Sequence, residues 1–174
     1  MRTFLTVNKK PLIEWSLLPL NTYYEGVVPD GYKLAINPSS EYIILDVDVD
    51  KYKDKNGFNN IPKYSKIKQL IYKLFLIKKQ SILNELQSTY HYNTKRGGKH
   101  YWLKYSGNKK LMNKASNLSI DLRIGPEIIN NKIINNGGYV IYYPANQGDN
   151  IRNHLNEIKE TSPEMNLFLE KLFC

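Results

Sequence analysis

Acidic side chains follow an apolar run about a quarter of the way along the chain. Residues 42–45 read Tyr-Ile-Ile-Leu, and Asp46, Asp48 and Asp50 then alternate with valines. Because side chains alternate across a β-strand, the three aspartates are expected to share one face, with Asp46 and Asp48 about 7 Å apart. Carboxylates so close repel one another, and a hard divalent cation such as Mg²⁺ or Mn²⁺ removes that repulsion. The pattern predicts a metal site, although Asp50 is explained equally well as a loop residue.

A further carboxylate lies in a second strand-like segment. In residues 119–124, Ser-Ile-Asp-Leu-Arg-Ile, the apolar side chains face one way, and Asp121 and Arg123 face the other. A carboxylate on a neighbouring strand would complete a site for two cations, which stand about 3.5–4 Å apart. The alternative is a surface ion pair between Asp121 and Arg123, which would stabilise the fold little.

Basic residues, glycines and a histidine are concentrated in residues 94–102. Arg96, Gly97, Gly98, Lys99 and His100 follow one another in that segment. Glycines let backbone N–H groups approach an anion closely, and the basic side chains and the imidazole can bind phosphate oxygens. The segment predicts a phosphate-binding turn. A solvated hairpin with a basic tip is the alternative.

The elements that must position these side chains follow from periodicity and turn residues. Apolar spacing predicts one long helix or two short ones over residues 61–87, and Gly97 and Gly98 can close a hairpin. A capping residue and a proline at residues 161–163 predict the start of a C-terminal helix. Strands are expected over residues 42–49, 89–94, 99–105, 119–124 and 138–143. The order predicts a single α+β domain with a mainly antiparallel central sheet and flanking helices.

Composition limits the classes of protein that this chain can belong to. The 174 residues carry a net charge of +9, which favours an anionic partner such as nucleic acid or a nucleotide. Lysine outnumbers arginine 21 to 4, so an AT-rich coding sequence is another source of the charge. Cys174 is the sole cysteine, which excludes an intrachain disulfide and a cysteine-built zinc site. With no membrane-length apolar run and no signal peptide, we expect a cytosolic protein without a membrane partner.

Taken in order, these segments resemble a known family. An apolar strand with Asp-x-Asp comes first, then Gly-Gly-x-His, then Ile-Asp-x-Arg, and finally Gly-Gly-Tyr-Val with a proline. This order is similar to that of the prim-pol domain of the archaeo-eukaryotic primase superfamily, found in phage and plasmid replication proteins. Lys10, Pro11 and Trp15 resemble the N-terminal signature of that family. The resemblance runs from about residue 10 to residue 146.

The resemblance implies a function for each matching residue. It implies a DNA primase/polymerase that transfers nucleotides by a two-metal mechanism, with Asp46, Asp48 and Asp121 as the catalytic ligands of two Mg²⁺ or Mn²⁺ ions. His100 matches the histidine that contacts the phosphates of the incoming nucleoside triphosphate, and Arg123 matches a basic position of the family. Lys99, Arg96 and Gly98 are expected to help hold the nucleotide. Arg96 replaces the serine usual before Gly-Gly-x-His, which bears on nucleotide contacts rather than on metal binding.

The same resemblance sets the expected domains and partners. Residues 1–150 would form an RRM-like prim-pol catalytic domain, and residues 151–174 a C-terminal helical segment packed on it. The expected partners are single-stranded DNA as template and primer, nucleoside triphosphates and a replicative helicase, in the host cytoplasm if a phage encodes the chain. The alternatives are a catalytically inert nucleic-acid-binding relative and a metal-dependent glycosyltransferase, which also uses Asp-x-Asp after a strand. A rolling-circle nickase is a weaker alternative, because no pair of histidines flanks a hydrophobic residue.

Overall fold

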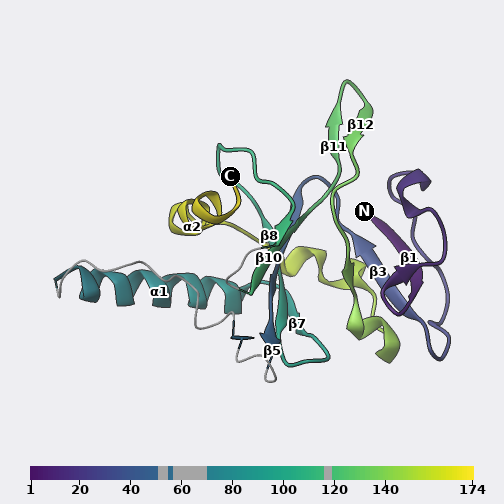
Figure 1. Cartoon of the computed structure of the whole chain (residues 1–174), viewed down its shortest axis with the longest axis horizontal. Coiled ribbons are helices and arrows are strands. Elements are labelled where there is room, and N and C mark those ends of the chain that lie inside the picture. The colour runs from purple at the N-terminus through teal and green to yellow at the C-terminus, as the bar shows by residue number, and fades with distance from the viewer. Residues whose placement is uncertain (51–54, 57–69, 116–118) are drawn as a thin grey trace.

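A computed structural model describes residues 1–50, 55–56, 70–115 and 119–174 of the chain. Two helices, a large sheet and a smaller sheet follow one another as layers (Figure 1). The strand pairs are antiparallel except for one, so the expected α+β class with a mainly antiparallel sheet is confirmed.

The larger sheet, sheet B, is built around β4 (Tyr42–Val47). This strand lies between β8 (Lys99–Lys104) and β10 (Ile120–Ile124) and is antiparallel to both. The outer strands of sheet B are β7 (His91–Asn93) and β14 (Lys159–Glu160), which pair with β8, and β9 (Lys114–Ala115), which pairs with β10. The apolar run before the aspartates therefore forms a central strand.

The side chains of β4 alternate between the two faces of sheet B and so contribute to two separate hydrophobic cores. Ile43, Leu45 and Val47 face the helices α1 (Leu70–Ser88) and α2 (Pro163–Phe173). The expected C-terminal helix is present, and its cap is Ser162 rather than Thr161: the Ser162 hydroxyl accepts a hydrogen bond from the Met165 amide at 3.1 Å. The expected helix over residues 61–87 is found from residue 70 to residue 88, and residues 61–69 lie outside the described part.

The opposite face of sheet B packs against the smaller sheet, sheet A. Tyr42 and Ile44 of β4 and Trp102 of β8 lie in this second core, together with Leu34 and Ile36. Sheet A runs in the order β13 (Val140–Ile141), β3 (Lys33–Asn37), β1 (Arg2–Val7) and β2 (Lys10–Pro11). Asp46 follows the same alternation as Tyr42 and Ile44, so its side chain points toward sheet A.

Shorter elements complete the chain. The segment between β10 and β13, for which the sequence predicted no strand, forms a hairpin of β11 (Glu127–Ile129) and β12 (Lys132–Asn135) that projects from the body (Figure 1). Asn130 and Asn131 turn it with positive φ angles, which asparagine tolerates better than most residues. The other short elements are β5 (Val49–Asp50), β6 (Lys55–Asn56) and the 3₁₀ helices η1 (Trp15–Leu17), η3 (Tyr143–Gln147) and η4 (Ile151–Glu157).

Candidate active site

Asp46 lies in one row with a histidine and a second aspartate across three strands. In the ladder, its partner on β8 is His100 and its partner on β10 is Asp121. Residues directly opposite in antiparallel strands point to the same face, with Cβ atoms about 4.5–5.5 Å apart. Side chains from three distant parts of the sequence therefore meet on the face toward sheet A.

Asp48 joins this row from beyond the end of the strand. The single strand expected over residues 42–49 is interrupted, since β4 ends at Val47 and β5 pairs with β6 outside sheet B, although the Asp48 amide still donates to the Ser119 carbonyl at 2.9 Å. Partial withdrawal of the Asp48 carboxyl from water raises its pKa, and the charges of Asp46 and Asp121 raise it further. The side chain of Asp50 lies outside the described residues.

His100 is buried, with only 4% of the residue exposed, and both of its ring nitrogens have close neighbours. Its Nδ1 lies 2.9 Å from the hydroxyl of Tyr92, which donates to the Ile141 carbonyl at 3.2 Å. A hydroxyl has one hydrogen to donate, so Nδ1 carries the hydrogen shared with Tyr92. Nε2 lies 3.2 Å from Asp46 Oδ1. Tyr92 thus holds the imidazole with Nε2 toward the carboxylates.

The carboxylates have oxygens that suit a cation. Oδ1 of Asp46 is buried and has no partner with hydrogen-bond geometry, despite its distance of 3.2 Å from His100 Nε2. Burying an ionised oxygen without a donor is unfavourable, and a hard cation would satisfy it. The described residues contain no preassembled group of three or more His, Cys, Asp or Glu side chains that could hold a metal ion. The donor set, which consists of carboxylate oxygens with one of them buried and unpaired, thus fits a divalent cation.

Arg123 holds the third carboxylate. Its Nη2 donates to Asp121 Oδ2 at 3.0 Å, as the alternative interpretation of this pair predicted. The side chains are only 25% and 16% exposed, so this is a half-buried pair rather than a surface one. Arg123 lines a cleft, whereas Asp121 is not among the described residues of the cleft wall.

The glycines position the hairpin between β7 and β8. Gly97 has a φ of +86°, and its amide donates to the Thr94 carbonyl at 3.1 Å to close the turn. A Cβ atom at Gly98 would collide with the carbonyl oxygen of Val47 and lie 3.2 Å from the Cα of Asp48. The expected hairpin therefore exists, and Gly98 serves to bring its backbone against the end of β4.

A cleft of about 840 Å³ opens between the two sheets at this row. Four of the residues singled out in the sequence line it: Asp46, Asp48, His100 and Arg96. Its basic lining residues are Lys9, Lys33, Lys95, Arg96 and Arg123, against the two carboxylates. Such a balance favours an anionic ligand that brings cations with it.

Lys99, unlike His100, is not among the residues that line the cleft. It precedes His100 on β8, so its side chain falls on the opposite face, where its Nζ lies 6.0 Å from the ring centre of Tyr101. The strict alternation of β8 places the two neighbours on different faces of the sheet.

Sequence reasoning singled out Trp15 and the Gly-Gly-Tyr-Val segment as motifs but did not place them, or the rest of the cleft wall, around the carboxylates. Tyr92, which holds His100, belongs to none of the sequence motifs. Its position two residues before the segment 94–102 was the sole signal for it in the sequence. Sheet A and its neighbouring segments supply the rest of the wall: Lys9, Trp15, Lys33, Gly137, Gly138, Tyr139, Val140, Ile141 and Tyr143. Their contribution could not be found without knowing that sheet A packs on this face of sheet B.

Comparisons of the chain with protein-family models, with curated proteins and with solved structures return no match. Among the described residues, no helix has the length and apolar character needed to cross a bilayer.

Proposed function

We propose that this chain is a prim-pol domain that adds nucleotides to a primer on a single-stranded DNA template. One observation carries the proposal: Asp46 lies opposite His100 and Asp121 in the sheet, beside Asp48, in a cleft lined by basic side chains. Carboxylates, an imidazole and cationic side chains are the groups that phosphoryl transfer needs. We assign the α+β fold as an RRM-like prim-pol core because of the order of the sequence motifs, from Asp-x-Asp to Gly-Gly-Tyr-Val.

Asp46, Asp48 and Asp121 would hold two divalent cations, Mg²⁺ or Mn²⁺. When bound, such ions activate the 3′-hydroxyl and neutralise charge on the pyrophosphate leaving group. The three carboxylates supply only oxygen ligands, which these ions prefer. To free its oxygen for a cation, Asp121 would exchange part of its ion pair with Arg123, leaving that guanidinium to bind substrate phosphate.

The remaining side chains of the cleft would bind and orient the triphosphate. With Nδ1 directed to Tyr92, His100 would donate from Nε2 to a phosphate oxygen in its doubly protonated form, and Lys95 and Arg96 would hold the β- and γ-phosphates. The 3′-oxygen of the primer forms a bond to the α-phosphorus, while the bond from that phosphorus to the bridging oxygen breaks. The hydroxyl proton passes to solvent and pyrophosphate leaves.

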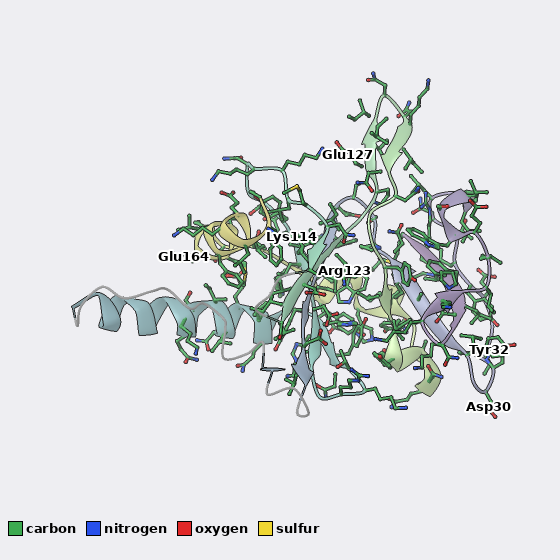
Figure 2. All side chains as sticks on the ribbon, in the orientation of Figure 1. Asp30, Tyr32, Lys114, Arg123, Glu127 and Glu164 are labelled. Atoms are coloured by element: carbon green, nitrogen blue, oxygen red, sulfur yellow. The ribbon has the colours of Figure 1, made fainter. Side chains whose placement is uncertain are left out.

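Extension of a labelled primer on single-stranded DNA with Mn²⁺ and nucleoside triphosphates tests the proposal. Asp46→Asn and Asp48→Asn should each reduce incorporation by about 10²- to 10³-fold, the usual effect of removing one electrostatic contact to a transition state. Asp30→Asn is the matched control, because Asp30 is an exposed turn residue at the periphery, far from the central Arg123 (Figure 2). Full activity in either site variant would refute the assignment.

A binding-only relative of the same family is the second candidate, favoured by the pairing of Asp121 with Arg123, which occupies an oxygen that a cation would need. Calorimetry separates the two functions. The polymerase requires nucleoside triphosphate binding that depends on Mn²⁺, whereas an inert module would bind DNA equally with or without the metal.

A further inference from the structure

The part of the cleft that lies on sheet A contains a rigid aromatic group. Trp15 begins η1, is only partly buried, and lines the cleft. Its ring stacks on Phe4 with centroids 5.5 Å apart and meets the ring of Tyr139 edge-on at 5.4 Å. An indole held by two aromatic neighbours loses little conformational freedom when a ligand stacks on its open part. None of the steps of nucleotide transfer described above uses this group.

Cationic side chains without acidic partners lie in the same part of the cleft. Lys9 forms the turn between β1 and β2 together with Asn8, both with positive φ angles, and its carbonyl accepts a hydrogen bond from the Tyr139 hydroxyl at 3.1 Å. Lys33 has its Nζ 5.8 Å from the ring centre of Tyr143. Neither lysine forms an ion pair with a described residue, so both are available to phosphates.

We infer that Trp15 is a stacking platform for a base of single-stranded DNA, with Lys9 and Lys33 on the phosphates beside it. A positive groove with an aromatic platform is how proteins bind single strands with little sequence preference. The cleft is continuous from Trp15 to Asp46, so a strand seated on the platform leads toward the carboxylates. The inference rests on the proposed function for the identity of its ligand.

Tryptophan fluorescence tests the inference directly, because the chain has two tryptophans and Trp102 is fully buried. An oligothymidylate of twelve nucleotides, added in EDTA at low salt, should quench the tryptophan emission of the wild-type protein and leave that of Trp15→Phe unchanged. A deoxynucleoside triphosphate with Mn²⁺ should cause no such quench. If the nucleotide quenches Trp15 and the oligonucleotide does not, the platform takes the incoming base and the inference is wrong.

Affinity for the same oligonucleotide provides the second measurement. Trp15→Ala should raise the Kd about 5- to 150-fold, the range of stacking energies per base. Leu17→Ala is the matched control, since Leu17 lies in the same 3₁₀ turn, is 75% exposed and does not line the cleft. Lys9→Ala and Lys33→Ala should each reduce the slope of log K against log salt by about 0.7.

An unchanged Kd in Trp15→Ala would overturn the inference. Binding in EDTA needs no cation, so a chain that lacks polymerase activity but shows Trp15-dependent oligonucleotide binding would refute the proposed function alone. Conversely, a chain that extends primers with unchanged affinity in Trp15→Ala would refute the platform alone.

Discussion

The Tyr92 hydroxyl fixes the orientation of the His100 imidazole: the two groups are 2.9 Å apart, and the hydroxyl is itself committed to the Ile141 carbonyl. Both side chains are buried and come from neighbouring strands, β7 and β8, where Tyr92 pairs with His100. Ile141 belongs to β13 of sheet A. One hydroxyl therefore connects the strand that carries His100 to the opposite wall of the cleft.

We predict that Tyr92→Phe weakens nucleotide binding more than chemistry. The variant keeps the ring but leaves Nδ1 of His100 and the Ile141 carbonyl without a partner, so the imidazole is no longer fixed. The KM for nucleoside triphosphate should rise about tenfold with a smaller change in kcat. Tyr90→Phe is the control, because Tyr90 loses a buried hydrogen bond of 2.8 Å to Tyr142 but does not contact His100. Equal effects of the two substitutions on KM would contradict the positioning role.

The two glycines of the hairpin should respond differently to alanine. Gly98→Ala places a methyl group against the Val47 carbonyl, so the hairpin must move away from the carboxylates, at a cost of about 1–3 kcal/mol. Gly97→Ala meets no atom within 4 Å and suffers only the strain of its positive φ, about 1–2 kcal/mol. Urea unfolding measures both losses. Primer extension should fall further in Gly98→Ala, and an identical loss in both variants would contradict the close-packing argument.

Part of the row formed by Asp46, His100 and Asp121 was predictable from alternation within single strands. In β10, apolar residues at every second position place Asp121 and Arg123 together on the other face. Nothing in the sequence says which strands are neighbours, however, so the meeting of Asp46 with both His100 and Asp121 needed the structure.

Other features depend on contacts that periodicity does not encode. The break after Val47 separates β4 in sheet B from β5, which pairs with β6 instead. Lys99 was assigned to the phosphate site by its place in the motif, although the alternation that places His100 in the cleft puts Lys99 on the other face. Trp15 and Lys33 line the cleft because of the packing of two sheets, which is a tertiary property.

The difference between Arg96 and Lys99 gives a third prediction. Arg96→Ala should raise the KM for nucleoside triphosphate about 10- to 150-fold, because a charged hydrogen bond to phosphate contributes about 1.5–3 kcal/mol. Lys99→Ala should leave KM unchanged, since its ammonium lies over Tyr101 on the helix-covered face. Steady-state kinetics with the concentration of one nucleotide varied measures both KM values. A larger rise in KM for Lys99→Ala than for Arg96→Ala would mean that the hairpin binds substrate on the helix-covered face of the sheet.

A polar network around His154 determines how the free energy of unfolding should depend on pH. His154 lies 2.8 Å from Glu157 and 3.0 Å from Asp149, stacks on Tyr90, and is linked through Asp149 to Tyr142. Burial lowers the pKa of His154, but the hydrogen bonds to the two carboxylates outweigh it, and the net shift is upward.

A raised pKa in the folded state means that this stabilisation is complete below the unfolded pKa of about 6.5 and is lost as pH rises through the folded value. The free energy of unfolding of the wild type should therefore fall relative to that of His154→Gln between pH 6 and pH 8. His91→Gln is the control, because the described contacts of the His91 ring are with the Thr89 carbonyl and the Tyr101 ring rather than with a carboxylate. Parallel stability curves for wild type and His154→Gln would show that the network adds nothing.

We expect Asp48→Asn to have opposite effects on stability, relative to the wild type, in the absence and in the presence of a divalent cation. Without a cation, Asp48 is repelled by Asp46 and Asp121, so Asp48→Asn should raise the free energy of unfolding by roughly 0.5–1 kcal/mol. With Mn²⁺ at about 100 times its Kd, the wild type should gain about 2.7 kcal/mol and become the more stable protein. Glu164→Gln, an exposed residue of the first turn of α2, is the control and should show the wild-type response to Mn²⁺. Thermal unfolding in EDTA and in Mn²⁺ measures the crossover, and a wild type that Mn²⁺ leaves unchanged would exclude metal binding by this row.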